Sequence, residues 1–165
     1  MDTVDKVNNL SKSDFISIFG NVFEKTSWIS EKTYNLKPFL NFEALQKSFL
    51  SVHDKCNDKQ YLEIFNSHPQ LAIEKIMTEH SKKEQTQSKL DTCTKEELEE
   101  FIQLNHDYKK KFNFPFIIAV ANLNKNEILD NFKQRINKNV SEEFEEAKIQ
   151  VKKIATLRLN QILKK

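Results

Sequence analysis

The chain has 165 residues, a formal net charge of +2, and 38% hydrophobic residues, with 13 Phe among them. This length and apolar content predict one compact domain over residues 1–165 and exclude a disordered chain, although 30% of the residues are charged. The charges are interleaved, which argues against a nucleic-acid-binding protein, and the single glycine, Gly20, excludes the glycine-rich loops of P-loop and Rossmann proteins.

The two cysteines, Cys56 and Cys93, provide no disulfide framework and suit a reducing compartment. No apolar run approaches the length that spans a bilayer, and residues 1–10 lack the apolar stretch of a secretory signal. We therefore expect a cytoplasmic protein whose residues 1–10 are weakly ordered. A peroxisomal location stays open, although the chain does not end in Ser-Lys-Leu. His53 and Cys56 could share a helix face, but no second pair of metal ligands follows, so no metal site is expected.

The first half of the chain predicts five helices, because apolar residues recur three and four positions apart. Each begins at a side chain that can cap the first turn, or at a proline, which suits that turn. The expected starts are Ser11 with Asp14, the segment around Trp28, Asn41, Asp58 and Pro69. The fifth helix is expected to carry Leu71, Ile73 and Ile76.

The second half of the chain predicts three longer helices. Thr94 with Glu97 and Asn124 with Glu127 have the spacing of capping boxes, and Ser141 opens a last helix that runs almost to the end. No segment alternates with the period of two that is typical of a strand. The sequence therefore predicts an all-α single domain of about eight helices.

Arg158 interrupts the apolar stripe of the last helix, at a position where the spacing predicts a hydrophobic residue. It is either an edge residue whose stem packs while its head reaches water, or a guanidinium that faces a pocket. In the second case its planar fork would suit a carboxylate or a ureido group.

His68 precedes Pro69, which places it at or near the start of the predicted fifth helix. There the helix dipole would lower the pKa of the imidazole and leave a neutral base. The alternative is a capping or surface histidine. Ser81, Glu84 and Gln85 would share one helix face, where they would either contact solvent or bind a polar ligand. Neither cysteine has the local setting of a catalytic nucleophile.

Four segments, in order along the chain, resemble the family of 2-oxo-4-hydroxy-4-carboxy-5-ureidoimidazoline (OHCU) decarboxylases, which act in urate breakdown. The long third segment is the most specific of them. The segments are His-Pro-Gln-Leu-Ala at 68–72, Ser-Lys-Lys-Glu-Gln at 81–85, Leu-Asn-His-Asp-Tyr at 104–108 running into Lys-Phe-Asn-Phe-Pro-Phe-Ile-Ile-Ala-Val at 111–120, and Ile-Ala-Thr-Leu-Arg-Leu at 154–159.

The resemblance implies an all-helical homodimer that converts OHCU to (S)-allantoin and CO₂ without a metal or an organic cofactor. It also implies that His68, Glu84 and Arg158 form the catalytic set and converge in one pocket. The substrate-binding residues implied in the same way are Pro69, Ser81, Gln85, Phe116, Ile117, Ile118, Ala119 and Val120. No nucleic acid or membrane partner is expected.

The chain departs from the family pattern at three positions. Asn113 and Asn122 stand where the family usually has glycine, and asparagine is the residue that best tolerates the left-handed backbone in place of glycine. Ala121 stands where a basic residue is common, which puts a charge role there in doubt.

Two other functions stay open at this point. A helical interaction module that has lost catalysis would need a large exposed apolar patch. A lyase that acts on a related ureido acid would keep the same site residues, because a fold and its polar groups do not fix one substrate.

Overall fold

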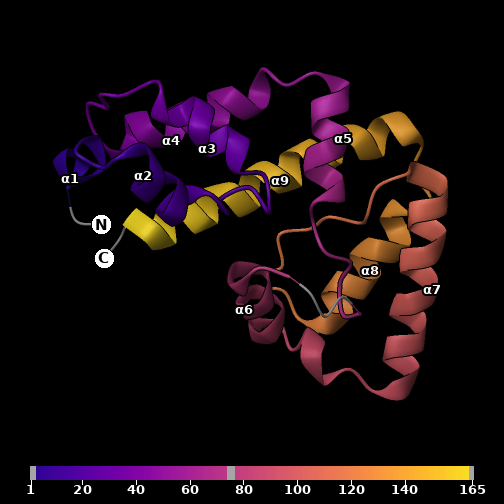
Figure 1. The fold of residues 1–165 in the computed structure, drawn as a ribbon. Helices are drawn as coiled ribbons and strands as arrows, with labels where there is room; N and C mark the ends of the chain where they lie inside the picture. The colour runs from indigo at the N-terminus through magenta and orange to yellow at the C-terminus, as the bar shows by residue number, and fades with distance from the viewer. Residues whose placement is uncertain (1–2, 74–76, 164–165) are drawn as a thin grey trace. The chain divides into compact units, whose positions relative to one another are not determined.

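The computed structural model describes residues 3–73 and 77–163 of the chain, and within them it is entirely helical (Figure 1). The all-α prediction is therefore confirmed, with nine α-helices and one 3₁₀ helix in these residues. Their bounds are α1 Val4–Asn8, α2 Lys12–Phe19, α3 Ser27–Tyr34, α4 Phe42–Asp54, α5 Asp58–Asn66, α6 Glu79–Gln87, η1 Leu90–Thr92, α7 Lys95–Phe112, α8 Lys125–Arg135 and α9 Val140–Leu163. No helix in the described part is both long and apolar enough to cross a bilayer.

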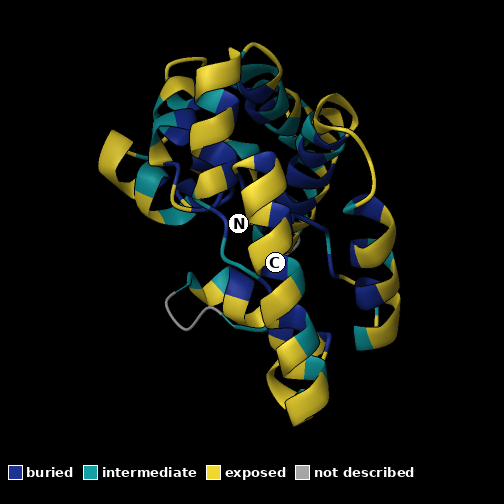
Figure 2. Ribbon diagram, turned by 90° about the vertical axis from the view of Figure 1, so that its right-hand side faces the viewer, coloured by how far each residue is buried: buried dark blue, intermediate teal, exposed yellow. Residues whose placement is uncertain are grey.

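The chain divides into two compact units, which are described separately. Unit 1 comprises Met1–Ile64 and Lys152–Lys165, and unit 2 comprises Phe65–Val151. Helix α9 contributes its first part to unit 2 and its last part to unit 1. The helices of both units bury one face and expose the other, as the blue and yellow bands of Figure 2 show.

The predicted caps are confirmed at the starts of four helices, α2, α4, α7 and α8. Ser11 Oγ accepts the N–H of Asp14 at 3.2 Å before α2, and the Asn41 side chain accepts the N–H of Ala44 before α4. Full capping boxes precede α7 and α8, where Thr94 pairs with Glu97 and Asn124 with Glu127. In each case the side chain satisfies an N–H group of the first turn that has no partner within the helix.

Two helices begin slightly earlier than predicted, because an asparagine outside the expected start forms the cap. Asn57 exchanges side chain–backbone hydrogen bonds with Gln60 before α5, and Asn139 does the same with Glu142 before α9. Residues 1–10, expected to be weakly ordered, contain the short helix α1, in which Val7 is buried.

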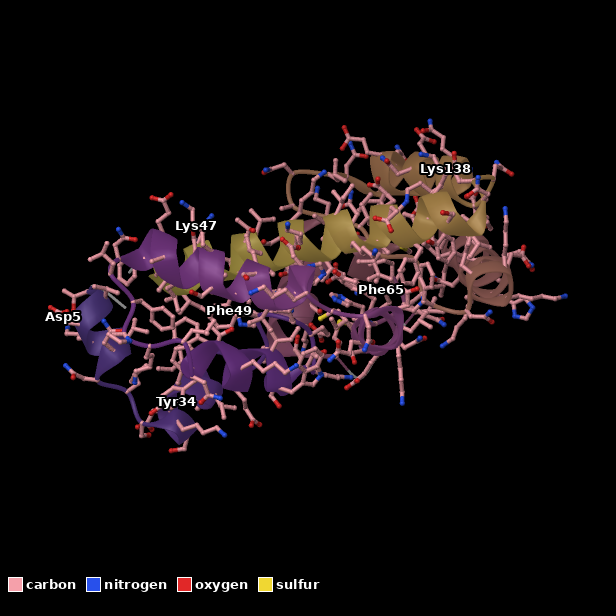
Figure 3. All side chains as sticks on the ribbon, turned by 90° about the horizontal axis from the view of Figure 1, so that it is seen from above. Asp5, Tyr34, Lys47, Phe49, Phe65 and Lys138 are labelled. Atoms are coloured by element: carbon pink, nitrogen blue, oxygen red, sulfur yellow. The ribbon has the colours of Figure 1, made fainter. Side chains whose placement is uncertain are left out.

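Aromatic rings fill the core of unit 1. The Phe15 and Phe49 rings stack with their centroids 5.9 Å apart, and Phe19 lies 5.7 Å from Phe49, which joins α2 to α4. Figure 3 labels Phe49 within this cluster, whereas Lys47 lies on the exposed side of α4. The high Phe content therefore forms a packed interior, as the composition predicts.

A second aromatic cluster forms the core of unit 2. The Phe65 ring contacts the Phe114 ring at 5.0 Å and the Phe144 ring at 5.3 Å. The Phe116 and Phe132 rings stack at 3.9 Å with an angle of 10°. Phe114 and Phe116 lie on the extended segment between α7 and α8, so this segment is anchored in the core.

The prediction of a fifth helix that begins at Pro69 is wrong. Residues 67–73 form turns and irregular structure, and Ile76 lies outside the described residues. Ala72 has φ = 67°, which is incompatible with an α-helix. The Leu71 carbonyl and the Ala72 N–H are bonded to side chains of other helices, so tertiary hydrogen bonds replace those that a helix would make.

The left-handed backbone expected at the two asparagine departures is confirmed. Asn113 ends α7 with φ = 63°, and Asn122 also has φ = 63°. Gly20 adopts an ordinary right-handed φ of −60°. It is needed for close packing, because a Cβ there would lie 2.4 Å from the Ile16 carbonyl oxygen.

We expect Asn113→Ala to lower the free energy of unfolding by about 1–2 kcal/mol, because alanine lacks the side chain that eases a left-handed residue. Asn113→Gly should be at least as stable as the natural chain. The measurement is urea unfolding followed by far-UV circular dichroism. Asn35→Ala is the control, because Asn35 is also exposed at a helix C-terminus but has φ = −69°. Equal effects of the two alanine substitutions would contradict the conformational explanation.

Candidate functional site

His68 lies on the irregular loop that follows α5 in unit 2. It is 8% exposed, and its N–H donates to the Phe65 carbonyl at 3.1 Å, so the residue continues from the C-terminal end of α5. Because the loop after Pro69 is not a helix, the predicted effect of a helix N-terminus on the pKa of His68 has no basis in the described residues. The alternative of a surface histidine is also wrong, since the side chain is buried.

Helix α6 presents the predicted polar face. Thr78 caps its first turn by accepting the N–H of Ser81. Ser81 and Gln85, one turn apart, are 4% and 7% exposed, and Glu84 beside them is half-buried. The alternative in which this face contacts solvent is therefore wrong for Ser81 and Gln85. Polar side chains in such positions need partners within the protein or from a ligand.

The extended segment before α8 is held by three side chains from other elements. Arg135 Nη1 donates to the Ile117 carbonyl at 2.7 Å. Gln150 Oε1 accepts the Ala119 N–H at 2.9 Å, and Ser88 Oγ donates to the Val120 carbonyl at 2.8 Å. These bonds occupy backbone groups on both sides of Ile118.

The N–H and carbonyl of Ile118 have no hydrogen bond to any residue within the described ranges, although Ile118 is only 6% exposed. Buried backbone groups are nearly always hydrogen-bonded in folded proteins. The two peptide groups that contain Ile118 therefore each keep one polar atom without a protein partner among the described residues, and the bonds of Ile117 and Ala119 fix their orientation.

A buried ionic cluster supports this segment. Arg135 Nη2 and Nε both donate to the Glu143 carboxylate, at 2.8 and 2.9 Å, and Tyr108 Oη donates to the same carboxylate. The Arg135 guanidinium also lies 4.4 Å from the centre of the Phe116 ring. Burial, followed by the hydrogen bond to Glu143, raises the pKa of Tyr108 well above its usual range, so the phenol stays protonated.

Two hydrogen bonds link the three parts of unit 2 that carry predicted site residues. The Ala72 N–H donates to Gln85 Oε1 at 3.0 Å, which joins the His68 loop to α6. Ser88, directly after α6, bonds to Val120 and joins α6 to the extended segment. The His68 loop, the polar face of α6 and the backbone around Ile118 are thus connected within one unit.

Arg158 lies in unit 1 and is fully buried. Its Nη1 donates to Glu24 Oε2 at 2.8 Å and to the Asn21 carbonyl at 2.9 Å, and the Glu24 side chain is also buried. The alternative in which the guanidinium reaches water is therefore wrong. Glu24 offsets the charge of Arg158, which is what a buried guanidinium requires.

Several polar residues of these networks were not singled out from the sequence as functional candidates. Arg135 carries the same signal as Arg158, since it falls three residues after the buried Phe132 on an otherwise apolar helix face. Glu24, Glu143 and Gln150 gave no signal, because each acquires its role only when its partner is brought next to it.

The two cysteines do not form a nucleophilic site. Burial raises the pKa of both thiols, Cys56 and Cys93, which disfavours the reactive thiolate. His53 packs its ring against Phe23 and Tyr61, with Nδ1 3.2 Å from Asp54 Oδ1. Among the described residues, no group of three His, Cys, Asp or Glu side chains is placed to hold a metal ion.

Comparison with known proteins assigns the class. The family model described as OHCU decarboxylase matches residues 8–160. An OHCU decarboxylase from Halalkalicoccus jeotgali is 32% identical over 160 residues, which cover 97% of this chain and 91% of that protein. A uric acid degradation bifunctional protein from Bacillus sp. TB-90 is 35% identical over 99% of this chain, but the chain spans only 33% of its length.

Solved structures agree on the fold. A crystal structure of (S)-allantoin synthase matches 99% of this chain and 54% of its own with a TM-score of 0.77 and 25% identity. A crystal structure of OHCU decarboxylase in the presence of (S)-allantoin matches 94% of this chain with a TM-score of 0.74 and 23% identity. The fold and the matches define a helical decarboxylase, which is a lyase. The chain belongs to the OHCU decarboxylase family.

Proposed function

We propose that the chain converts OHCU to (S)-allantoin and CO₂ without a metal or an organic cofactor. The observation that carries the proposal is the connection, within unit 2, of a buried histidine loop, a buried polar helix face and the backbone around Ile118. Family membership supplies the reaction class and the substrate. The proposal covers only the decarboxylation and not the remaining activity of the longer bifunctional relatives.

The reaction needs a place for the electron pair left by the departing carboxylate. As the carbon–carboxylate bond breaks, the pair moves toward the adjacent imine-like carbon, whose double bond shifts its electrons onto the ring nitrogen. The nitrogen takes up a proton. The hydroxyl group then loses its proton to form the carbonyl, and the carbon that carries the ureido arm gains one. The products are allantoin and CO₂, with no oxidant or reductant required.

In the proposal, His68 is the general acid–base group for these proton transfers. It takes the hydroxyl proton or returns a proton to the product carbon, and delivery from one face gives one allantoin enantiomer. Glu84 orients the imidazole or the ureido nitrogens, and its charge favours the protonated imidazole. The burial of His68 and the half-buried position of Glu84 support these roles, because both groups would act away from bulk water.

The remaining groups bind the substrate. Ser81 and Gln85 hydrogen-bond to the ring and the ureido arm, Pro69 packs against the ring, and the backbone from Phe116 to Val120 completes the pocket. The peptide groups around Ile118 are the strongest candidates within that segment, because hydrogen bonds occupy their neighbours.

Arg158 enters the proposal through the family resemblance. Its guanidinium binds an anionic or carbonyl oxygen of the substrate, a role that suits a planar donor fork. The role rests on that resemblance, since the guanidinium itself is bonded to Glu24 and to the Asn21 carbonyl within unit 1. A homodimeric state and a cytoplasmic location belong to the same proposal.

The proposed activity is tested by generating OHCU with urate oxidase and hydroxyisourate hydrolase and adding the protein. OHCU decays spontaneously, so the protein-free sample is the reference. We expect CO₂ to be released faster in the presence of the protein, in proportion to its concentration. Release at the protein-free rate would reject the proposed function.

A further inference from the structure

One peptide group of the His68 loop is held at both of its polar ends by buried side chains. Asn105 Nδ2, on α7, donates to the Leu71 carbonyl at 3.0 Å. Gln85 Oε1, on α6, accepts the Ala72 N–H of the same peptide group at 3.0 Å. Asn105 and Gln85 are 2% and 7% exposed, so water does not compete effectively for these bonds.

The clamped peptide leads into a strained residue. Ala72 has φ = 67°, a left-handed conformation that its Cβ disfavours and that glycine or asparagine normally occupies. Such residues persist only where the surrounding structure holds them, and they gather at functional sites. Here the surrounding structure is the pair of side chains from α6 and α7, and the strained residue is four positions after His68.

The amide of Asn105 has a defined orientation. Its nitrogen must face the Leu71 carbonyl, because the opposite orientation would place two oxygens together. Its oxygen is buried and has no hydrogen bond among the described residues. Among the described residues, the side chain of Asn105 therefore makes one hydrogen bond, to the loop, and its oxygen is left without a donor.

We propose that Asn105 is a positioning residue for His68, acting through the Leu71–Ala72 peptide together with Gln85. The clamp prevents the loop after His68 from relaxing to an ordinary backbone conformation, and so fixes the direction of the imidazole. The inference rests on the proposed function of His68. It assigns to Asn105 no contact with the substrate.

The first test is the kinetics of Asn105→Ala, with Gln103→Ala as the matched control. Gln103 lies on the same helix, but it is exposed, and within the described part of the chain its side chain bonds to Asp107 alone. A loss of about 10²-fold in kcat with little change in KM is expected for Asn105→Ala, because misplacing a reacting group by a small distance has an effect of that order. Gln103→Ala should keep the natural kcat. An unchanged kcat in folded Asn105→Ala would overturn the proposal.

The second test observes the imidazole directly and needs no substrate. The chain has only 4 His residues, so their side-chain NMR signals can be assigned with single His variants. Asn105→Ala should shift or broaden the His68 signals and leave those of His53, in unit 1, unchanged. Unmoved His68 signals would overturn the proposal even if the natural chain failed to decarboxylate OHCU, so the two failures are distinguishable.

A third variant covers the case in which alanine prevents folding. Asn105→Asp keeps the size of the side chain, and its carboxyl can donate to the Leu71 carbonyl only when protonated. Relative to the natural chain, its kcat should therefore rise as the pH falls. A kcat ratio that stays constant with pH would contradict the clamp.

Discussion

Replacement of His68 by alanine is expected to lower kcat by about 10²–10⁴-fold, the usual contribution of a general acid–base group. The fold should survive, because the loop that carries His68 is held through its backbone by Asn105 and Gln85. The measurement is the steady-state rate of OHCU loss above the spontaneous rate, with far-UV circular dichroism to verify the fold.

The control for this prediction is His106→Ala. His106 is exposed on α7 and should tolerate the change with an unaltered kcat. If His68→Ala turned over OHCU at nearly the natural rate, the imidazole would have no part in the proton transfers, and another group would have to supply them.

Glu24→Gln is expected to lower the free energy of unfolding by about 3–5 kcal/mol, because it removes the charge of one partner from a buried ion pair and leaves the charge of Arg158 in place. Both side chains of this ion pair are buried, at 1% and 0% exposure. Urea unfolding followed by tryptophan fluorescence suits the measurement, since the single Trp, Trp28, lies in unit 1 with the ion pair.

The control is Glu31→Gln, which removes an ion pair of the same unit that is open to solvent. The Lys12–Glu31 pair is 3.1 Å long with both side chains about half exposed, and such pairs contribute at most about 1 kcal/mol. Equal losses in the two variants would show that burial does not strengthen the Glu24–Arg158 pair.

The same variant also has an expected kinetic effect. The KM of Glu24→Gln should rise if Glu24 orients Arg158 toward substrate.

The helices with local start signals were predictable, because capping depends on residues three apart in the sequence. Thr94 with Glu97 and Asn124 with Glu127 form the expected capping boxes. The helix predicted at Pro69 failed because the conformation there depends on residues that are distant in the sequence. The proline ring suits a first helical turn, but distant side chains hold the loop that follows in a conformation that no helix contains.

In the candidate site, too, local sequence patterns indicated single residues but not their distant partners. The sequence indicated Arg158 as a charged residue in an apolar stripe, and the structure places it in the core of unit 1. Its partner Glu24 is 134 positions away along the chain, so no local pattern could identify it. The hydrogen bonds of Arg135 and Gln150 to the segment around Ile118 could not be predicted either, because they form between separate elements. Family resemblance supplied the backbone segment itself.

The enantiomeric composition of the allantoin formed from freshly generated OHCU shows whether a protein-held group delivers the proton to one face of the product. The natural chain should accelerate the loss of OHCU and yield optically active (S)-allantoin. Spontaneous decay has no such preference and gives both enantiomers. A racemic product formed at the protein-free rate would show that no group of the protein delivers this proton.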